Sequence, residues 1–235
     1  MALLRSHVTF VCEDGFNMPA YIAYSGMSVR PALIMLHDAS GMSDEMKRIA
    51  DLVAASGYVV MIPDLFGRGD WLQGLRHQIK CIIEEKGQVF SDILAARRHL
   101  QSLEGVEANR IGIMGFSIGA GFAMILARSG LFKVSAAFYG STPKTLEGCC
   151  PIMASFGARD RVMTPRAVGL AERLQRLNIP SDIKVYENAG HGFMTKSPSL
   201  AVEILGRLCP LRIAFNRNAS RDAFARLYRF LSQHL

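Results

Sequence analysis

The chain has 235 residues, half of them hydrophobic, with 21 glycines, 9 prolines and a formal net charge of +7. This length suits a single domain, residues 1–235, with a large buried core, and the composition excludes a disordered chain. No apolar stretch approaches the length of a membrane helix, and the first residues form too short an apolar run for a signal peptide, so we expect a cytoplasmic protein without a membrane partner.

The first part of the chain alternates strand and helix patterns. Strand-like residues 8–12 and 20–24 flank Asp14-Gly15, a turn signal that predicts an antiparallel hairpin. A buried strand at 32–36, a helix at 44–56 with Ser43 as its N-cap, and a strand at 58–62 follow. Residues 64–87 lack clear periodicity apart from a possible short helix at 75–83, which predicts an active-site loop or lid.

The rest of the chain continues the alternation. Helices are predicted at 89–103, 117–129 and 164–177, the last with Pro165 in its first turn, and strands at 110–114, 134–139, 152–157 and 183–186. The tail contains a helix broken before Pro210 and an amphipathic helix at 221–233. The pattern predicts an α/β fold with a mostly parallel central sheet, an N-terminal antiparallel hairpin, and helices on both faces.

The positive charge raises the question of a nucleic-acid partner. The nearest approach to a basic cluster is on the C-terminal helix, where a solvated face is the better interpretation: Arg217, Arg221, Arg226 and Arg229. No nucleic-acid motif accompanies these residues, so we predict no such partner. The five cysteines lack the spacing of metal ligands, and we expect reduced thiols and no metal.

One stretch indicates covalent catalysis. Gly115-Phe116-Ser117-Ile118-Gly119 has the G-x-S-x-G pattern of a nucleophile elbow, with a predicted strand before it and a predicted helix after it. A turn this sharp needs glycine two residues to either side of the serine, because a side chain there would collide with neighbouring backbone. Ser117 is therefore the predicted nucleophile.

A nucleophilic serine needs a base and a group that orients the base. Asp160 follows the predicted strand 152–157, although it could instead pair with Arg159 or Arg161 or cap a turn. His191 stands between two glycines after the last predicted strand, which completes the order Ser, Asp, His. We therefore predict that His191 is the base and Asp160 its orienting acid, and that they act with Ser117 on an ester-like carbonyl.

The oxyanion is expected to be held by two backbone N–H groups. One belongs to Ile118, directly after the nucleophile, and the other to Ala39 in the loop after strand 32–36, here called the oxyanion loop (residues 37–41). His37 competes with His191 as the base, but its place fits this loop better.

Other candidate substrate contacts rest on weaker signals. Arg68 could meet an anionic substrate or equally pair with Asp64 or Asp70. Trp71 and Phe193 could line an apolar pocket, although aromatic side chains are more often core.

Five motifs, in order and at similar spacing, resemble the dienelactone hydrolase family: Leu36-His37-Asp38-Ala39-Ser40-Gly41, Ile62-Pro63-Asp64-Leu65-Phe66-Gly67-Arg68, Met114-Gly115-Phe116-Ser117-Ile118-Gly119, Phe138-Tyr139-Gly140 and Ala189-Gly190-His191-Gly192-Phe193. The resemblance implies an α/β-hydrolase fold and a cytoplasmic, cofactor-free enzyme, a monomer or homodimer, that cleaves an ester or lactone of a small molecule.

The chain also departs from that family. The best-known members have cysteine where Ser117 stands, glutamate where Asp38 stands, and a substrate-binding arginine where this chain has Thr195. We therefore predict a serine variant that keeps esterase chemistry on a substrate other than dienelactone, with Asp38 and His37 beside the substrate. An acyl thioesterase, and a non-catalytic ligand-binding protein on a hydrolase scaffold, remain the alternatives.

Overall fold

The computed structural model describes residues 2–26, 28–197 and 199–235. Its strands are β1 (Leu3–Val11), β2 (Asn17–Ser25), β3 (Arg30–Leu36), β4 (Val59–Pro63), β5 (Val106–Phe116), β6 (Ser135–Phe138), β7 (Ile152–Gly157) and β8 (Ser181–Tyr186). Its α-helices are α1 (Asp44–Ala55), α2 (Trp71–Glu84), α3 (Gln88–Gln101), α4 (Ile118–Leu126), α5 (Leu170–Arg176), α6 (Leu200–Leu208) and α7 (Arg217–His234).

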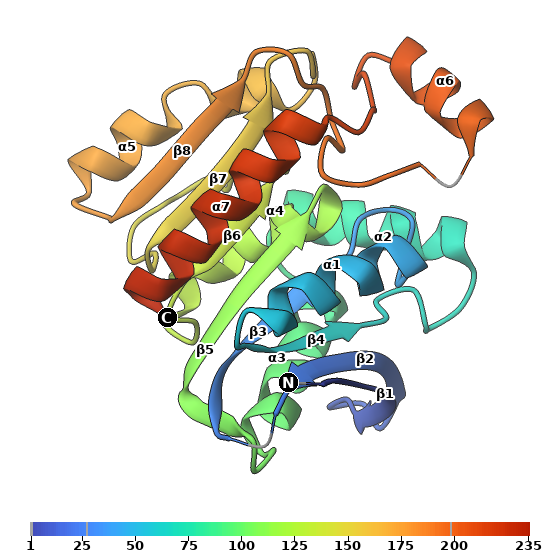
Figure 1. The fold of residues 1–235 in the computed structure, drawn as a ribbon, viewed down its shortest axis with the longest axis vertical. Coiled ribbons are helices and arrows are strands. Elements are labelled where there is room, and N and C mark those ends of the chain that lie inside the picture. The colour runs from blue at the N-terminus through green and yellow to red at the C-terminus, as the bar shows by residue number, and fades with distance from the viewer. Residues whose placement is uncertain (1, 27, 198) are drawn as a thin grey trace.

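The strands form one eight-stranded sheet in the order β1-β2-β4-β3-β5-β6-β7-β8 (Figure 1). β1 and β2 make the predicted hairpin, and β2 also runs antiparallel to β4, whereas every pair from β4 to β8 is parallel. The predicted mostly parallel sheet with an N-terminal antiparallel hairpin is confirmed. The carboxyl ends of β3, β5, β7 and β8 share one edge, where ligands bind in open α/β sheets.

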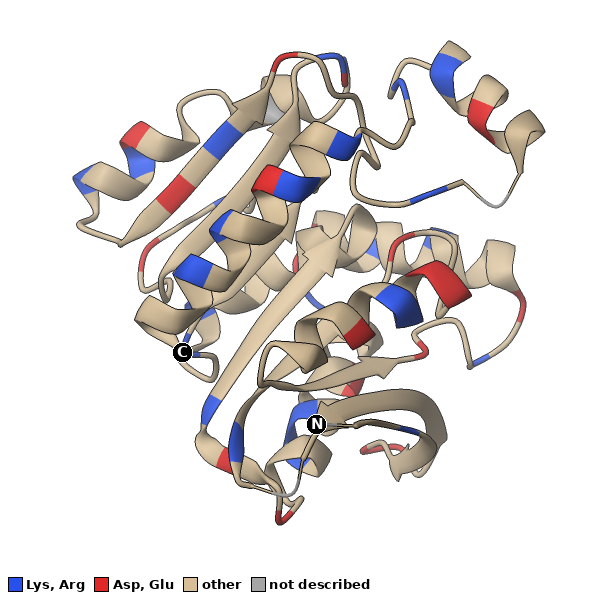
Figure 2. Cartoon of the chain, in the orientation of Figure 1, with Lys and Arg blue, Asp and Glu red and all other residues tan. Residues whose placement is uncertain are grey.

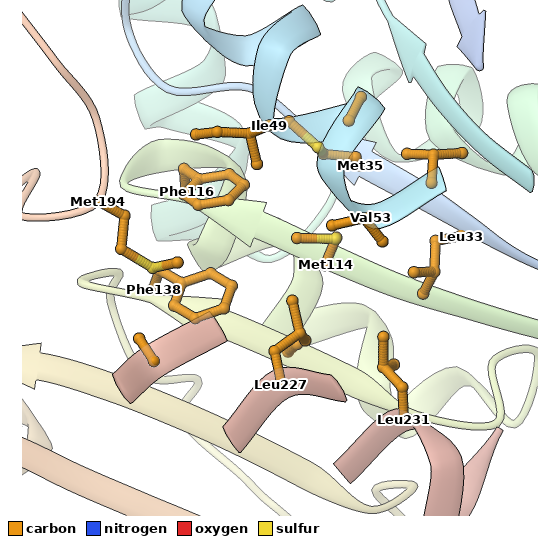
Figure 3. Packing of buried hydrophobic residues seen from close by; sticks show 14 of the residues in the cluster. Leu33, Met35, Ile49, Val53, Met114, Phe116, Phe138, Met194, Leu227 and Leu231 are labelled. Atoms are coloured by element: carbon orange, nitrogen blue, oxygen red, sulfur yellow. The ribbon is translucent and has the colours of Figure 1, made fainter. Parts of the chain in front are cut away.

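Helices cover both faces of the sheet, as predicted. α1 and α7 pack on one face, where the core joins residues of β3, β5 and β6 to both helices (Figure 3). On the other face α3 and α4 pack against the middle strands, and α5 packs farther along, near β7. α4 is the most enclosed of these helices, with every residue from Gly119 to Leu126 buried. This double coverage holds the elbow between β5 and α4 in place.

Local signals set the helix boundaries where they are strong. Ser43 caps α1 as predicted, because its Oγ accepts a hydrogen bond from Met46 N at 3.4 Å. The apolar stripe of α1 faces the core, with Met46, Ile49 and Val53 fully buried. The predicted helix at 164–177 is interrupted instead, because Gly169 has a φ of 75° and separates a short 3₁₀ turn from α5.

The segment 64–87 is more regular than predicted. α2 occupies 14 of its residues, and Asp70, directly before it, caps the helix because its side chain accepts a hydrogen bond from Gln73 N at 3.0 Å. Its apolar residues Leu72, Leu75, Ile79, Ile82 and Ile83 recur at helical spacing, although only Gln78 and Cys81 of the helix are buried.

The prediction of a solvated arginine face on the C-terminal helix is wrong for one residue. The side chain of Arg226, a residue of α7, is buried. It donates hydrogen bonds to Asp182 at 2.6 Å and to the hydroxyls of Ser155 and Tyr186. A buried guanidinium needs such partners, and the sequence alone could not show that Asp182 faces it. Among the described residues no helix is long and apolar enough to cross a membrane. All five cysteines are free thiols.

Candidate active site

Ser117 occupies the sharp turn between β5 and α4. Its φ of 53° and ψ of −114° are strained for a residue with a side chain. A Cβ added at Gly115 would lie 2.3 Å from the carbonyl oxygen of Gly119, and one added at Gly119 would lie 2.5 Å from that of Leu36. Both glycines are therefore required by contact with backbone, as the motif predicted. The turn presents Ser117 at the carboxyl edge of the sheet.

The three predicted catalytic side chains lie in one hydrogen-bonded row. His191 Nε2 lies 2.7 Å from Ser117 Oγ, and His191 Nδ1 lies 2.8 Å from Asp160 Oδ2. An ionised carboxylate can only accept, so Nδ1 carries the proton and Nε2 is left to accept the proton of the serine hydroxyl. Ser117, Asp160 and His191 are thus brought together from segments far apart in the sequence.

Asp160 is buried and fully engaged. Its second oxygen, Oδ1, accepts from the backbone N–H groups of Val162 and Met163, each at 2.9 Å. Burial opposes ionisation, but the hydrogen bonds from His191, Met163 and Val162 outweigh it and lower the pKa of Asp160. The alternative of an ion pair with a neighbouring arginine does not hold for Arg159, whose side chain donates to Asn188 instead. Turn capping and contact with His191 coexist in the same carboxylate.

Two hydrogen bonds with the segment after α6 fix the backbone of His191. Its N–H donates to Leu211 O at 2.9 Å, and its carbonyl oxygen accepts from Ala214 N at 3.2 Å. Gly190 lies so close to this segment that a Cβ there would be 1.9 Å from the carbonyl oxygen of Arg212. The segment after α6 therefore holds the histidine loop in place. No local sequence pattern indicated this role.

Tyr139 is a site neighbour to which the sequence analysis gave no role, although it lies in one of the five motifs of the family resemblance. Its ring stands edge-on to the His191 ring, with centroids 5.0 Å apart, and it also contacts Phe193. It is buried, and burial together with the charge of Asp38 raises the pKa of its phenol well above the usual value. Tyr139 therefore stays neutral beside the histidine. Its position directly after β6, at the carboxyl edge, was the available signal.

The oxyanion loop lies against the first turn of α4. The carbonyl oxygens of Leu36 and His37 are the atoms that crowd Gly119. Ile118 is the first residue of α4, where a backbone N–H has no partner within the helix. Asp38 Oδ1 accepts from Ser40 N at 2.8 Å and from Ser40 Oγ. Asp38 thus shapes the loop that carries Ala39.

His37 does not reach the substrate side and is not a base. It is fully buried, its Nδ1 donates to Asp38 O at 2.8 Å, and its Nε2 accepts from Leu65 N at 3.1 Å. Burial lowers the pKa of the imidazole, which keeps it neutral. The prediction of a substrate contact is corrected: His37 links the oxyanion loop to the segment after β4.

Two further predicted substrate contacts are also corrected. The Arg68 guanidinium is bound by two carboxylates, Asp14 and Asp92, each at 2.7 Å, rather than by Asp64 or Asp70. Phe193 is fully buried in the core. Trp71 remains exposed near the site, and its Nε1 donates to the Ala39 carbonyl oxygen at 2.8 Å. That hydrogen bond ties the start of α2 to the oxyanion loop.

The described residues contain no group of three His, Cys, Asp or Glu side chains placed to hold a metal ion. The chemistry available from this row of side chains is nucleophilic attack by a serine with an adjacent base.

Comparison with known proteins identifies the family. The model of the dienelactone hydrolase family matches residues 18–235. The chain belongs to the dienelactone hydrolase family.

Several relatives and solved structures align with most of this chain. A Bradyrhizobium protein named "Probable 2-oxo-3-(5-oxofuran-2-ylidene)propanoate lactonase" is 26% identical over 199 residues, 77% of this chain and 80% of that protein. A carboxymethylenebutenolidase of Rhodococcus opacus is 25% identical over 75% of each chain. The crystal structure of a dienelactone hydrolase-like promiscuous phosphotriesterase from metagenomic libraries superposes with a TM-score of 0.84 at 17% identity, covering 100% of this chain and 99% of that one. This dienelactone hydrolase family member is thus a hydrolase with the α/β-hydrolase fold.

Proposed function

We propose that this protein is a serine hydrolase that cleaves an ester or lactone of a small molecule through a Ser117-His191-Asp160 triad. The observation that carries the proposal is the continuous pair of hydrogen bonds, 2.7 Å and 2.8 Å long, from Ser117 Oγ through the His191 ring to Asp160. A serine is a weak nucleophile unless an adjacent base accepts its proton, and this row supplies that base already oriented.

The reaction proceeds in two halves. His191 Nε2 takes the proton of Ser117 as Oγ attacks the carbonyl carbon, and the resulting oxyanion is held by the N–H groups of Ile118 and Ala39. His191 then gives the proton to the leaving oxygen, the ester bond breaks, and an acyl-enzyme remains. A water molecule, deprotonated by His191, attacks the acyl carbon, and the proton returns to Ser117 as the acid leaves.

Asp160 and Tyr139 serve the histidine in different ways. The Asp160 carboxylate holds the proton on Nδ1 and stabilises the imidazolium formed during each half of the reaction. Tyr139 confines the ring from its edge without adding charge, because its phenol stays neutral. Asp38 takes no part in proton transfer, since its oxygen binds Ser40 within the oxyanion loop.

Lactones and esters are supported by the names of the relatives, a lactonase and a carboxymethylenebutenolidase. The arginine that the family resemblance associates with a substrate carboxylate is replaced by Thr195, whose Oγ1 donates to Gly192 O within its own loop. Arg68 is already bound by two carboxylates and offers no substitute. The preferred substrate is therefore one that does not depend on an arginine clamp.

A labelling experiment tests the nucleophile. A fluorophosphonate probe should add to Ser117 in the native protein and leave the Ser117→Ala variant unlabelled, as read by intact mass and peptide mapping. Ser6, an exposed serine of β1 away from the triad row, provides the control: the Ser6→Ala variant should still label. Stoichiometric labelling of the Ser117→Ala variant would refute the assignment.

A substrate panel then tests the reaction class. Activated esters, lactones and acyl thioesters of equal chain length should be compared by kcat/KM with the native protein and the His191→Ala variant. We expect turnover of esters and lactones that His191→Ala abolishes. Preference for thioesters would indicate the thioesterase alternative, and no turnover of any class would indicate a non-catalytic ligand-binding protein.

A further inference from the structure

A cavity of about 660 Å³ lies beside the loops that carry Asp160 and His191. Its walls come from the residues after β7, the residues after β8, the end of α6 and the segment that returns from α6. No side chain of the catalytic row lines it. The His191 backbone bonds to Leu211 and Ala214 of the returning segment, whereas its ring faces Ser117. The cavity therefore lies behind the histidine loop and is a site separate from the nucleophile.

The cavity is lined by four arginines: Arg159, Arg161, Arg207 and Arg212. Figure 2 shows the basic positions on α6 and on the segments around it. Among the described residues, only one carboxylate pairs with any of the four, Glu203 with Arg207. The side chains of Arg159 and Arg212 donate to neutral oxygens, those of Asn188 and of the Arg207 backbone, at 3.0 Å and 2.9 Å.

Carboxylates neutralise several other arginines of the same molecule. Arg68 binds two carboxylates, and the other ion-paired arginines each bind one: Arg5, Arg48, Arg98, Arg110, Arg128 and Arg226. Other arginines bind only neutral oxygens, as Arg97 does with Leu131 O and Gln101, so what distinguishes the cavity is that its arginines share one concave site. Four arginines line the cavity, and among the described residues only Arg207 of these four pairs with a carboxylate, which leaves an excess of positive charge in a concave site.

The walls of the cavity are held in place without a ligand. Asn188 accepts from Arg159 through its side chain and from Asn216 Nδ2 through its backbone carbonyl, at 2.9 Å for the second bond. The close approach of Gly190 to the carbonyl oxygen of Arg212 fixes the position of that arginine along the wall. A site whose donors are already positioned binds an anion with little ordering cost.

We propose that this cavity binds a small molecule through a phosphate group. Guanidinium groups recognise phosphate with paired, charge-assisted hydrogen bonds, and a doubly charged group is the better match for an excess of several positive charges. The volume falls in the range of small-molecule sites, about 300–1,000 Å³. It leaves room for an organic part against Phe215 and the alanines of the wall. This binding site is independent of the proposed esterase reaction.

Calorimetric titration of the full chain at low ionic strength tests the proposal. The probes are inorganic phosphate, pyrophosphate and adenosine 5′-monophosphate, added to the native protein and to three single variants: Arg161→Gln, Arg212→Gln and Arg221→Gln. Arg221 is the matched control, an exposed arginine of α7 outside the cavity lining. Thermal unfolding of each variant checks that the fold is retained.

We expect saturable binding of at least one probe with a stoichiometry of one. Arg161→Gln and Arg212→Gln should each weaken it by about tenfold or more, the equivalent of about 1.4 kcal/mol per tenfold, and Arg221→Gln should not. Binding of the nucleotide more tightly than of inorganic phosphate would identify a phosphorylated organic molecule as the ligand, and equal binding would identify free phosphate. Absence of saturable binding for all three probes, or equal weakening by Arg221→Gln, would overturn the proposal. Neither result depends on esterase activity.

Discussion

The strained backbone of Ser117 makes a stability prediction that is independent of catalysis. At a φ of 53° and ψ of −114° a residue with a Cβ is strained, whereas glycine is not. Such a conformation costs about 1–3 kcal/mol, and glycine returns about 0.5–1 kcal/mol of that through the entropy of its unfolded chain. We therefore expect the Ser117→Gly variant to be more stable than the Ser117→Ala variant by about 1 kcal/mol.

The comparison with alanine isolates the strain. Both variants lose the hydrogen bond from Oγ to His191, so this loss cancels in the difference. For a chain of this length, 1 kcal/mol corresponds to a shift of about 2–4 °C in Tm, which calorimetry or circular dichroism resolves. Urea unfolding of the same pair gives the free-energy difference directly.

A second pair of variants serves as a control in which the expected stability difference between glycine and alanine has the opposite sign. Ser91 lies within α3, where glycine is less favourable than alanine by about 1 kcal/mol, so Ser91→Gly should be the less stable of its pair. If Ser117→Gly also proves less stable than Ser117→Ala, and by a similar amount, then the elbow stores no strain. In that case the positive φ would have to be an ordinary, inexpensive conformation at this position.

Three further predictions follow from the site. Asp38→Asn should lower kcat/KM on an activated ester by about tenfold, or ~1.4 kcal/mol, because Asp38 only shapes the oxyanion loop. Asp160→Asn should lower it by up to about 10⁴-fold, because it disturbs the histidine tautomer, and the reverse ranking would mean that the wrong carboxylate has been assigned. The lowered pKa of Asp160 means that its ionised form stabilises the fold above the unfolded value of about 3.9 and that this contribution disappears as the pH falls through the lower folded pKa. The gap in unfolding free energy between the native protein and Asp160→Asn should therefore narrow below about pH 4, and a gap that is constant with pH would contradict the ionised, hydrogen-bonded carboxylate. Gly190→Ala should lower both stability, by about 1–3 kcal/mol, and turnover, because a Cβ there meets Arg212 O. Gly105→Ala, where a Cβ meets nothing within 4 Å, should leave turnover unchanged, and equal losses in the two variants would refute the role of this contact.

The sequence was informative wherever a local pattern has a single structural solution. The two glycines around Ser117, the cap at Ser43 and the Asp14-Gly15 turn each fix a short piece of backbone, and all three were predicted. The candidate triad was found in the same way, because each member follows a recognisable strand and parallel strands bring their carboxyl ends to one edge.

The sequence was uninformative wherever a partner comes from a distant segment. Arg68 is bound by Asp14 and Asp92, which lie 54 and 24 positions away, so its neighbours in sequence suggested the wrong partners. Arg226 turns inward only because Asp182 meets it from β8. Tyr139 contacts the His191 ring because of the order of the strands in the sheet, and the spacing of residues along the chain does not show that order.

The extent of α2 was underestimated although the sequence carries a signal for it. A helix is detected from its apolar stripe, and α2 buries only Gln78 and Cys81 while it exposes Trp71, Ile79 and Ile83. Leu72, Leu75 and Ile79 nevertheless recur at the helical period of 3.6, and Ile82 and Ile83 continue it. Together with the cap at Asp70, this period was a signal for the full length of the helix.

α4 and α2 differ in how well they can tolerate amino-acid substitutions. α4 is enclosed along its length, and an added Cβ at its Gly121 would already press on Ile82 of α2 at 2.9 Å, so most substitutions there compete with folding. Trp71, the first residue of α2, is hydrogen-bonded to the oxyanion loop. The helix nevertheless exposes several large side chains to solvent. Exposed positions tolerate substitution at little cost in stability. A mutagenesis library that seeks new substrate preferences therefore belongs on the outer face of α2, where sequence diversity can accumulate without first exhausting the stability margin of the fold.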